Sequence, residues 1–211
     1  LQSEATQVVV ATDSEEILAA CQANQIEAVL TRADHPTGTD RLSEVALKLK
    51  LEPNAIVVNV QGDEPFIPPA LINEVAQALA NHPECAIATA GLPITDEAEI
   101  NNPNAVKIAL AKSGQALYFS RAPIPYLRDA GTTIDGVRCV RHIGMYAYRA
   151  SFLKEFSSLA PAPIEQAEAL EQLRALWHGY RIQVMLTKEA PPAGVDTPED
   201  LARAQQVWGT I

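Results

Sequence analysis

Short apolar runs of strand length alternate along this chain with segments whose apolar residues recur at helical spacing. The first unit has apolar runs at residues 8–11 and 26–30, with a helical pattern over residues 15–23 between them. A strand, a helix and a second strand in this order form the unit of a parallel sheet. The 211 residues suit one domain of ordinary size. The sequence therefore predicts an α/β fold with a mixed, largely parallel sheet in a single domain, residues 1–211.

The alternation of strands and helices continues to the end of the chain. The patterns predict strands at residues 55–60, 85–92, 105–110, 116–119, 141–148 and 182–186, and helices at 41–49, 68–80, 164–177 and from Pro198 onward. The run 55–60 is nearly all apolar, which is typical of a strand covered on both faces. Residues 122–137 carry Pro and Gly at several positions. We expect a small excursion from the main sheet at about residues 120–148, and we interpret it as the dimerisation segment.

Charge and composition exclude several classes of protein. The net charge is −10 and the isoelectric point is about 4.8, whereas non-specific nucleic-acid binding needs a surplus of cations. The apolar runs are too short to span a membrane, and the first residues lack a basic region followed by an apolar one. The three cysteines form no CxxC pair, so neither zinc nor a disulfide framework is indicated. We expect a cytoplasmic protein without nucleic-acid or membrane partners.

Two acidic residues follow predicted strands at their carboxyl ends, where open α/β sheets bind ligands. Asp63 follows the strand at 55–60 after a Gly, and Asp196 follows the strand at 182–186 just before a helix start. Two carboxylates that converge would bind Mg²⁺, a hard cation that prefers oxygen ligands and keeps waters for phosphate oxygens. The alternative is that each is a solvated loop acid.

The loop from His35 to Arg41 is a second candidate site. Its small residues let backbone N–H and C=O groups approach a planar base, and Arg41 can meet a phosphate or pair with an acid. The alternative is an ordinary capped loop, with Thr39 or Asp40 at the N-cap of the next helix. No GxGxxG or GxxxxGK fingerprint is present to decide between them.

The third candidate is the polar side of the strand at 141–148, together with Arg121. Arg121 and His142 can hold a carboxylate, with the Arg in bidentate geometry. The alternatives are a structural histidine and, for Tyr146, a packed aromatic. Glu171 and Gln172 lie off the apolar stripe of the helix predicted at 164–177, where adjacent polar residues are usually solvated.

Seven segments together resemble the sugar-acid cytidylyltransferases, and within them the enzymes that act on 3-deoxy-manno-octulosonate (Kdo). They are TRADHPTGTDR at 31–41, VVNVQGDEP at 57–65, NPNAVK at 102–107, LYFSR at 117–121, RHIGMYAYR at 141–149, LEQLR at 170–174 and GVDTPED at 194–200. The resemblance runs from about Val8 to the C-terminal helix. It implies a Rossmann-like nucleotidyltransferase fold, a cytoplasmic homodimer, and synthesis of CMP-Kdo and pyrophosphate from CTP and Kdo for lipopolysaccharide biosynthesis.

The resemblance also assigns roles to residues. Asp63 and Asp196 correspond to the catalytic acids that bind Mg²⁺. The residues on the cytosine side are Thr37, Gly38, Thr39 and Arg41. The contacts with the sugar acid are Gln61, Arg121, His142, Tyr146, Glu171 and Gln172.

The resemblance is incomplete at the front of the chain. The family begins with a strand and a loop rich in Arg, Pro, Gly and Lys that wraps the triphosphate, and we expect that unit to be absent from these 211 residues. Two alternative functions stay open: a related cytidylyltransferase specific for sialic acid, and an inactive dimeric protein that binds sugar nucleotides.

Overall fold

The computed structural model describes residues 2–126, 128, 139–192 and 194–208. Its strands are β1 (Val10–Thr12), β2 (Ala28–Leu30), β3 (Ile56–Asn59), β4 (Ile87–Ile94), β5 (Lys107–Leu110), β6 (Ala116–Ser120), β7 (Cys139–Arg149) and β8 (Ile182–Leu186). Its helices are α1 (Glu15–Ala23), α2 (Gly38–Lys48), α3 (Pro69–Ala80), α4 (Glu97–Asn101), α5 (Ala150–Phe156), α6 (Pro163–Glu168), α7 (Gln172–Trp177) and α8 (Pro198–Trp208). The predicted alternation of strands and helices is confirmed, and only α4 and α5 were not expected.

The main sheet is mixed, as predicted. Its strands lie in the order β6-β5-β7-β4-β8, and β3 joins by pairing with β7. The strands β3, β4, β5 and β8 run in one direction, while β7 and β6 run in the other. The long strand β7 lies between β3 and β4, antiparallel to both, so β4 with β8 is the parallel pair among the described neighbours. The first unit forms its own parallel pair, β1 with β2.

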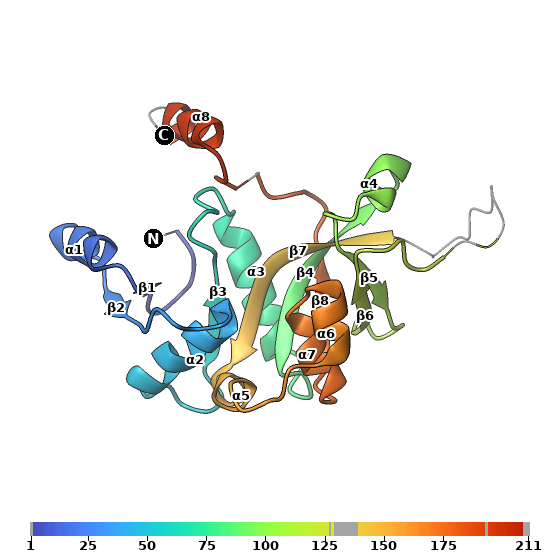
Figure 1. The fold of residues 1–211 in the computed structure, drawn as a ribbon, viewed down its shortest axis with the longest axis horizontal. Helices are drawn as coiled ribbons and strands as arrows, with labels where there is room; N and C mark the ends of the chain where they lie inside the picture. Colours follow the sequence, from blue (N-terminus) through green and yellow to red (C-terminus); the bar gives the residue numbers. More distant parts are fainter. Residues whose placement is uncertain (1, 127, 129–138, 193, 209–211) are drawn as a thin grey trace.

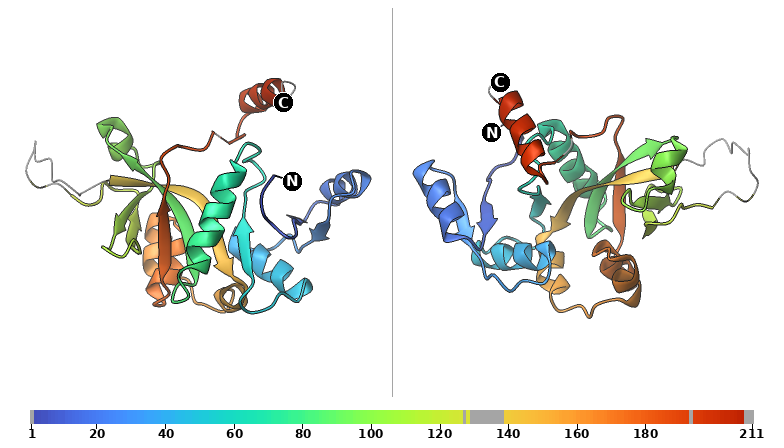
Figure 2. Two further views of the ribbon diagram at one scale, coloured as in Figure 1. Left: turned by 180° about the vertical axis from the view of Figure 1, so that it is seen from behind. Right: turned by 45° about the horizontal axis from the view of Figure 1, so that its top comes forward.

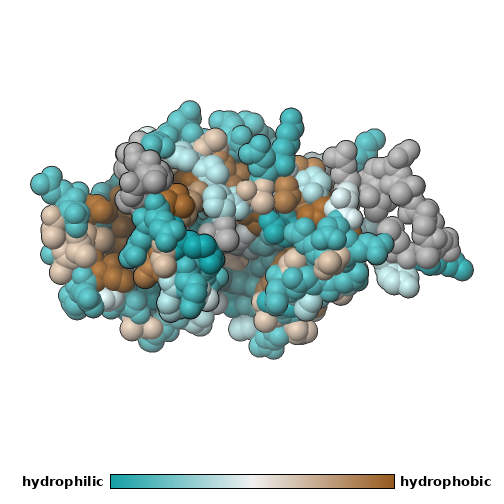
Figure 3. All heavy atoms as spheres, turned by 90° about the horizontal axis from the view of Figure 1, so that it is seen from above, coloured by the Kyte–Doolittle hydropathy of each residue, from teal (hydrophilic) through white to brown (hydrophobic). Residues whose placement is uncertain are grey.

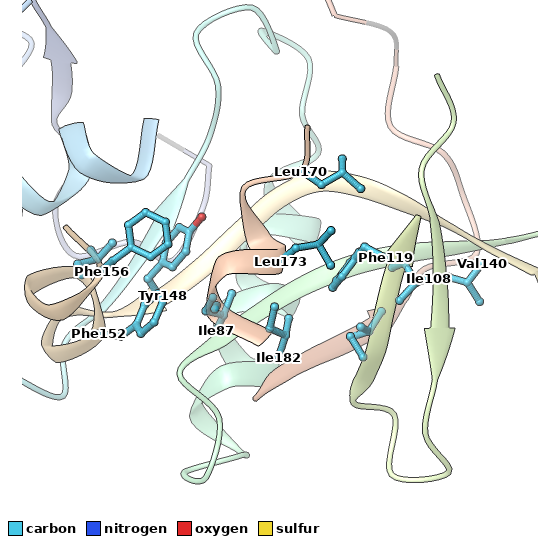
Figure 4. Packing of buried hydrophobic residues seen from close by; sticks show 14 of the residues in the cluster. Ile87, Ile108, Phe119, Val140, Tyr148, Phe152, Phe156, Leu170, Leu173 and Ile182 are labelled. Carbon is cyan, nitrogen blue, oxygen red and sulfur yellow. The ribbon is translucent and has the colours of Figure 1, made fainter. Parts of the chain in front are cut away.

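Helices cover both faces of the main sheet (Figures 1 and 2). On one face, Leu71, Val75 and Leu79 of α3 pack against Ala88 of β4 and Ala147 of β7. The opposite face packs against α5 and α7, as Figure 4 shows. The buried residues of this second cluster include Ile87, Ile108, Phe119, Val140, Tyr148, Phe152, Phe156, Leu173 and Ile182. Neighbouring positions such as Ile87 and Ala88 therefore serve opposite layers, as the alternation of side chains along a strand requires.

The prediction that the strand at 55–60 is covered on both faces is confirmed only in part, since Val57 packs against one core cluster and Ile56 and Val58 pack against the other. Every residue of β3 is only half-buried, because in the described part of the chain β3 pairs on one side only, with β7. Viewed from above (Figure 3), apolar atoms gather on the side of the molecule that carries α1, β1 and β2. Val8, Ile17 and Ile26 in that part are exposed. Neither of the two core clusters of the described residues contains a residue of α1, β1 or β2.

The single helix predicted at residues 164–177 is wrong, since the structure has two short helices there. Between α6 and α7, Ala169 adopts a left-handed conformation with φ 51°. Arg121 donates from Nε to the carbonyl of Glu168 at 2.8 Å and from one terminal nitrogen to that of Ala169 at 3.4 Å. A continuous helix would use these carbonyls itself, so a distant residue stabilises the break.

The C-terminal part extends away from the sheet. The chain leads from β8 past the loop after β3 to α8, which stands off from the main sheet in Figure 1 and in the left view of Figure 2. Residues 127 and 129–138 of the predicted excursion lie outside the described residues, while its last part is β7. The described helices include none that is both long and apolar enough to cross a membrane.

Candidate functional site

The segments that carry Asp63 and Asp196 lie against each other at the carboxyl ends of β3 and β8. The N–H of Val195 donates to the carbonyl of Asp63 at 2.7 Å. A Cβ on Gly194 would lie 3.1 Å from that same carbonyl oxygen, so the absence of a side chain permits this close approach. The structure thus brings together the two loops that the sequence analysis singled out.

Negative charge concentrates where these two loops meet. Asp63 and Asp196 are exposed, and Glu64 beside them is half-buried. Burial raises the pKa of Glu64, and repulsion from Asp63 and Asp196 raises it further. Glu64 was missed as a candidate residue, although it lies in one of the segments that carry the resemblance.

The donor set at this junction suits Mg²⁺. Among the described residues no three acidic, histidine or cysteine side chains are grouped as a complete metal site. Mg²⁺ does not require one, since it is commonly held by one or two carboxylates and takes its remaining ligands from water and substrate phosphates. The carboxylates of Asp63 and Asp196 supply the hard oxygen donors that this ion prefers.

Hydrogen bonds at the start of α8 hold the backbone of Asp196 in place. The hydroxyl of Thr197 accepts from the N–H of Asp200 at 3.2 Å, and the carboxylate of Asp200 accepts from the N–H of Thr197 at 2.9 Å. This reciprocal pair is a capping box, and it confirms the predicted helix start. Asp200 also accepts from the N–H of Asp196 at 3.2 Å.

The loop before α2 is a capped helix start with open space at its end. The N-cap is Thr37, which accepts from the N–H of Asp40 at 3.2 Å, so the expectation of a cap at Thr39 or Asp40 is wrong. A Cβ on Gly38 would meet no atom within 4 Å. Arg41 donates to Thr31 at 2.7 Å and pairs with Asp13 at 3.2 Å, which lowers the pKa of Asp13. Arg41 therefore ties α2 to the ends of β1 and β2.

A small recess with a largely apolar wall and a few polar groups lies between β7 and the start of α7. Its volume is about 20 Å³, room for a single polar group. The residues that line it are Thr39, Ile87, Tyr146, Tyr148, Phe156, Glu171 and Gln172. It brings the end of the nucleotide-loop candidate, Thr39, next to three of the expected sugar-acid contacts. The hydroxyls of Thr39 and Tyr148 lie 3.3 Å apart.

Two side chains in this recess have buried polar atoms without a partner. Oε1 of Glu171 and Nε2 of Gln172 are buried and form no hydrogen bond with the described residues. The interpretation of both as solvated helix positions is wrong, because the break after α6 turns them inward. Burial raises the pKa of Tyr146 well above its usual value. Unpaired buried groups cost free energy and favour a polar ligand that satisfies them.

The other three residues expected to contact the sugar acid lie in three different environments. They are Arg121, Gln61 and His142. Besides its bonds to α6, Arg121 donates to the carbonyl of Pro103 at 3.1 Å, so main-chain carbonyls engage all three guanidinium nitrogens. Gln61 is exposed, and its carbonyl accepts from the N–H of Glu64 at 3.1 Å in the turn after β3. His142 packs against Tyr146, with ring centroids 5.2 Å apart.

The fold defines the class of protein. The chain shares its Rossmann-like α/β fold with a solved 4-diphosphocytidyl-2C-methyl-D-erythritol synthase, at a TM-score of 0.55 and 13% identity. That alignment covers 95% of this chain and 79% of the other.

Closer relatives identify the family. The family model described as Cytidylyltransferase matches residues 1–182. The 3-deoxy-manno-octulosonate cytidylyltransferase of Polynucleobacter necessarius subsp. necessarius is 64% identical over 98% of this chain and 81% of its own length. A solved CMP:2-keto-3-deoxy-manno-octonic acid synthetase complexed with CTP aligns at a TM-score of 0.88 and 39% identity, over 99% of this chain and 83% of the other. The chain belongs to the cytidylyltransferase family, and within it to the 3-deoxy-manno-octulosonate cytidylyltransferases.

Proposed function

We propose that this protein transfers the cytidylyl group of CTP to Kdo, giving CMP-Kdo and pyrophosphate for lipopolysaccharide biosynthesis. The observation that carries this proposal is the 64% identity, over 98% of the chain, with a relative of that name. The geometry supports it, because the acidic junction lies beyond the carboxyl ends of β3 and β8, where α/β folds bind ligands, and because the recess brings Thr39 next to three of the expected sugar-acid contacts.

The reaction forms one bond and breaks one. The anomeric hydroxyl oxygen of Kdo attacks the α-phosphorus of CTP, the bond from that phosphorus to the bridging oxygen of the β-phosphate breaks, and the hydroxyl proton passes to solvent. Asp63 and Asp196 would hold Mg²⁺, which neutralises phosphate charge when bound. No general base stands out among the described residues, so positioning and electrostatics supply most of the acceleration.

The substrates would bind on either side of Thr39. The open N-terminus of α2, with Thr37, Gly38 and Thr39, is the proposed contact for the cytosine side of CTP, and Arg41 holds this loop against β1. The recess supports the binding of the sugar acid, because Glu171 and Gln172 offer it one unpaired acceptor and one unpaired donor. Tyr146, His142, Gln61 and Arg121 complete the proposed sugar-acid surface.

Two further properties belong to this proposal. The protein acts in the cytoplasm as a homodimer that pairs through the segment at about residues 120–148. Tyr126 in this segment and Leu117 on β6 are large apolar side chains exposed to solvent. Burial of such side chains against a second copy of the chain supports this interface. Sedimentation of a variant with Tyr126→Asp tests the interface, and an unchanged dimer would reject this segment.

Pyrophosphate release is the decisive assay for the reaction. With CTP and Mg²⁺, we expect release when Kdo is added and little when N-acetylneuraminate is added. A preference for N-acetylneuraminate would show that sialic acid, and not Kdo, is the substrate. No pyrophosphate release with either sugar acid would favour the inactive protein that binds sugar nucleotides.

A further inference from the structure

A buried threonine fills an irregularity in the centre of the sheet. The pairing of β4 with β7 shifts after Thr89, because Thr89 faces Tyr146 while Ala90 faces Ile143, so β7 carries two extra residues at this point. Thr89 is fully buried. Its hydroxyl lies 2.8 Å from the carbonyl of Met145, 3.2 Å from that of Ile143 and 3.0 Å from Nε2 of His142.

These three contacts indicate where the hydroxyl proton of Thr89 and the ring proton of His142 lie. A carbonyl oxygen only accepts, so we assign the single hydroxyl proton of Thr89 to the carbonyl of Met145, which is the nearer of the two carbonyls. The oxygen of Thr89 is then an acceptor toward His142, and Nε2 of His142 must carry a proton. In a neutral imidazole the other nitrogen, Nδ1, is then an acceptor. Within the described residues Nδ1 forms no hydrogen bond.

The surroundings of the ring favour this neutral form. His142 lies between Phe119, at a centroid distance of 5.3 Å, and Tyr146 at 5.2 Å. Burial among these groups lowers the pKa of His142 to about 3. A neutral ring lacks the charge that would attract the carboxylate of a sugar acid, whereas an imidazole nitrogen with a free lone pair accepts readily from a hydroxyl.

We propose that Thr89 is a positioning residue that fixes His142 as the neutral Nε2–H tautomer, so that Nδ1 accepts a hydrogen bond from a hydroxyl of the sugar acid. This inference rests on the proposed function, and it replaces the expectation that His142 helps to hold the carboxylate. Tyr146 connects the ring to the recess, because it packs on His142 and lines the recess.

The first test needs no substrate. Long-range ¹H–¹⁵N correlation spectra of ¹⁵N-histidine-labelled protein report the tautomer of each of the four histidines, and a His142→Gln variant assigns the signal. We expect the Nε2–H tautomer in the wild type and in Thr89→Ser, which keeps the hydroxyl. Thr89→Val keeps the shape and removes the hydroxyl, and we expect it to lose the fixed tautomer. A protonated ring or an Nδ1–H tautomer in the wild type would overturn the proposal, as would an unchanged tautomer in Thr89→Val.

The second test measures KM for each substrate. Thr89→Val should raise KM for Kdo about tenfold, the worth of one hydrogen bond, and leave KM for CTP near the wild-type value. Thr89→Ser should keep both. Equal rises for both substrates, or the same rise in Thr89→Ser, would show a merely structural role and reject the proposal. If Thr89→Val does not fold, the tautomer in the wild type and the constants of Thr89→Ser still decide. A wild type without turnover contradicts the proposed function alone, since the tautomer is read without substrate.

Discussion

The guanidinium of Arg174 on α7 donates to both carboxylate oxygens of Glu165 on α6, through Nε at 2.9 Å and a terminal nitrogen at 2.6 Å. Both residues are buried. Glu165 also accepts from the N–H of Ala162 at 3.0 Å, and Arg174 lies over the ring of Phe156 at 4.6 Å. This pair joins the two short helices on either side of the turn that presents Glu171 and Gln172.

Removing one partner of this pair should destabilise the protein strongly. Arg174→Met leaves the carboxylate of Glu165 buried without its cation, which typically costs about 3–5 kcal/mol. Denaturant unfolding of Arg174→Met measures the loss. Arg32→Met is the matched control, because the Arg32–Asp34 pair is exposed and surface pairs contribute little. A similar small effect for both variants would contradict a structural role of the buried pair.

Stability should fall in acid through Glu44. Lys48 donates to this carboxylate at 2.6 Å, and it lowers the pKa of Glu44 from 4.5 to about 2, together with His35 and the N–H of Arg32, against the effect of burial. A lowered carboxyl pKa gives stability that is present above the ordinary pKa and is lost as pH falls through the native one. The advantage of the wild type over Glu44→Gln should therefore be complete at pH 7 and shrink between pH 4.5 and 2. Urea unfolding at several pH values checks this, and a constant difference would refute it.

The sequence predicted elements that carry a clear local pattern of apolar residues, and it missed features that have no such pattern. The helix at residues 15–23 and the strand at 182–186 match α1 and β8 residue for residue. The break after α6 has no local signal, since it depends on the side chain of Arg121, which is 47 positions away from Glu168.

The residues of the candidate site also differ in whether the local sequence indicates their position. The meeting of the loops that carry Asp63 and Asp196 was predictable, because both loops follow strands whose carboxyl ends share one edge of the sheet. The inward position of Glu171 and Gln172 was not, because helical periodicity places them off the apolar stripe. Thr89 carries no signal in the sequence, since a threonine within a strand pattern is ordinary and its role arises from the register shift in β7.

Loss of the carboxylate of Asp196 should abolish turnover without unfolding the protein. The side chain is exposed, so Asp196→Asn removes a charge from the proposed Mg²⁺ site and no packing. A bound metal supplies several kcal/mol of transition-state stabilisation, so we expect a loss on the order of 1000-fold in kcat/KM. Glu189→Gln, an exposed acid on the same connecting segment, should be near wild type. Near-normal turnover of Asp196→Asn at saturating Mg²⁺ would reject the metal assignment.

Stability and substrate binding should move in opposite directions at Gln172. Its Nε2 is buried without a partner, which typically costs about 1–3 kcal/mol, so Gln172→Leu should raise the free energy of unfolding by about 1 kcal/mol. The same change removes a donor from the recess, and KM for Kdo should rise while KM for CTP stays constant.

Gln183→Leu is a matched control, because Oε1 of Gln183 is also buried without a partner but the residue lies on β8 and does not line the recess. Unfolding curves and steady-state kinetics on both variants separate the two effects, since only Gln172→Leu should change KM for Kdo. If Gln172→Leu lost stability and kept KM, Gln172 would be a structural residue, and the recess would not be the place where the sugar acid binds.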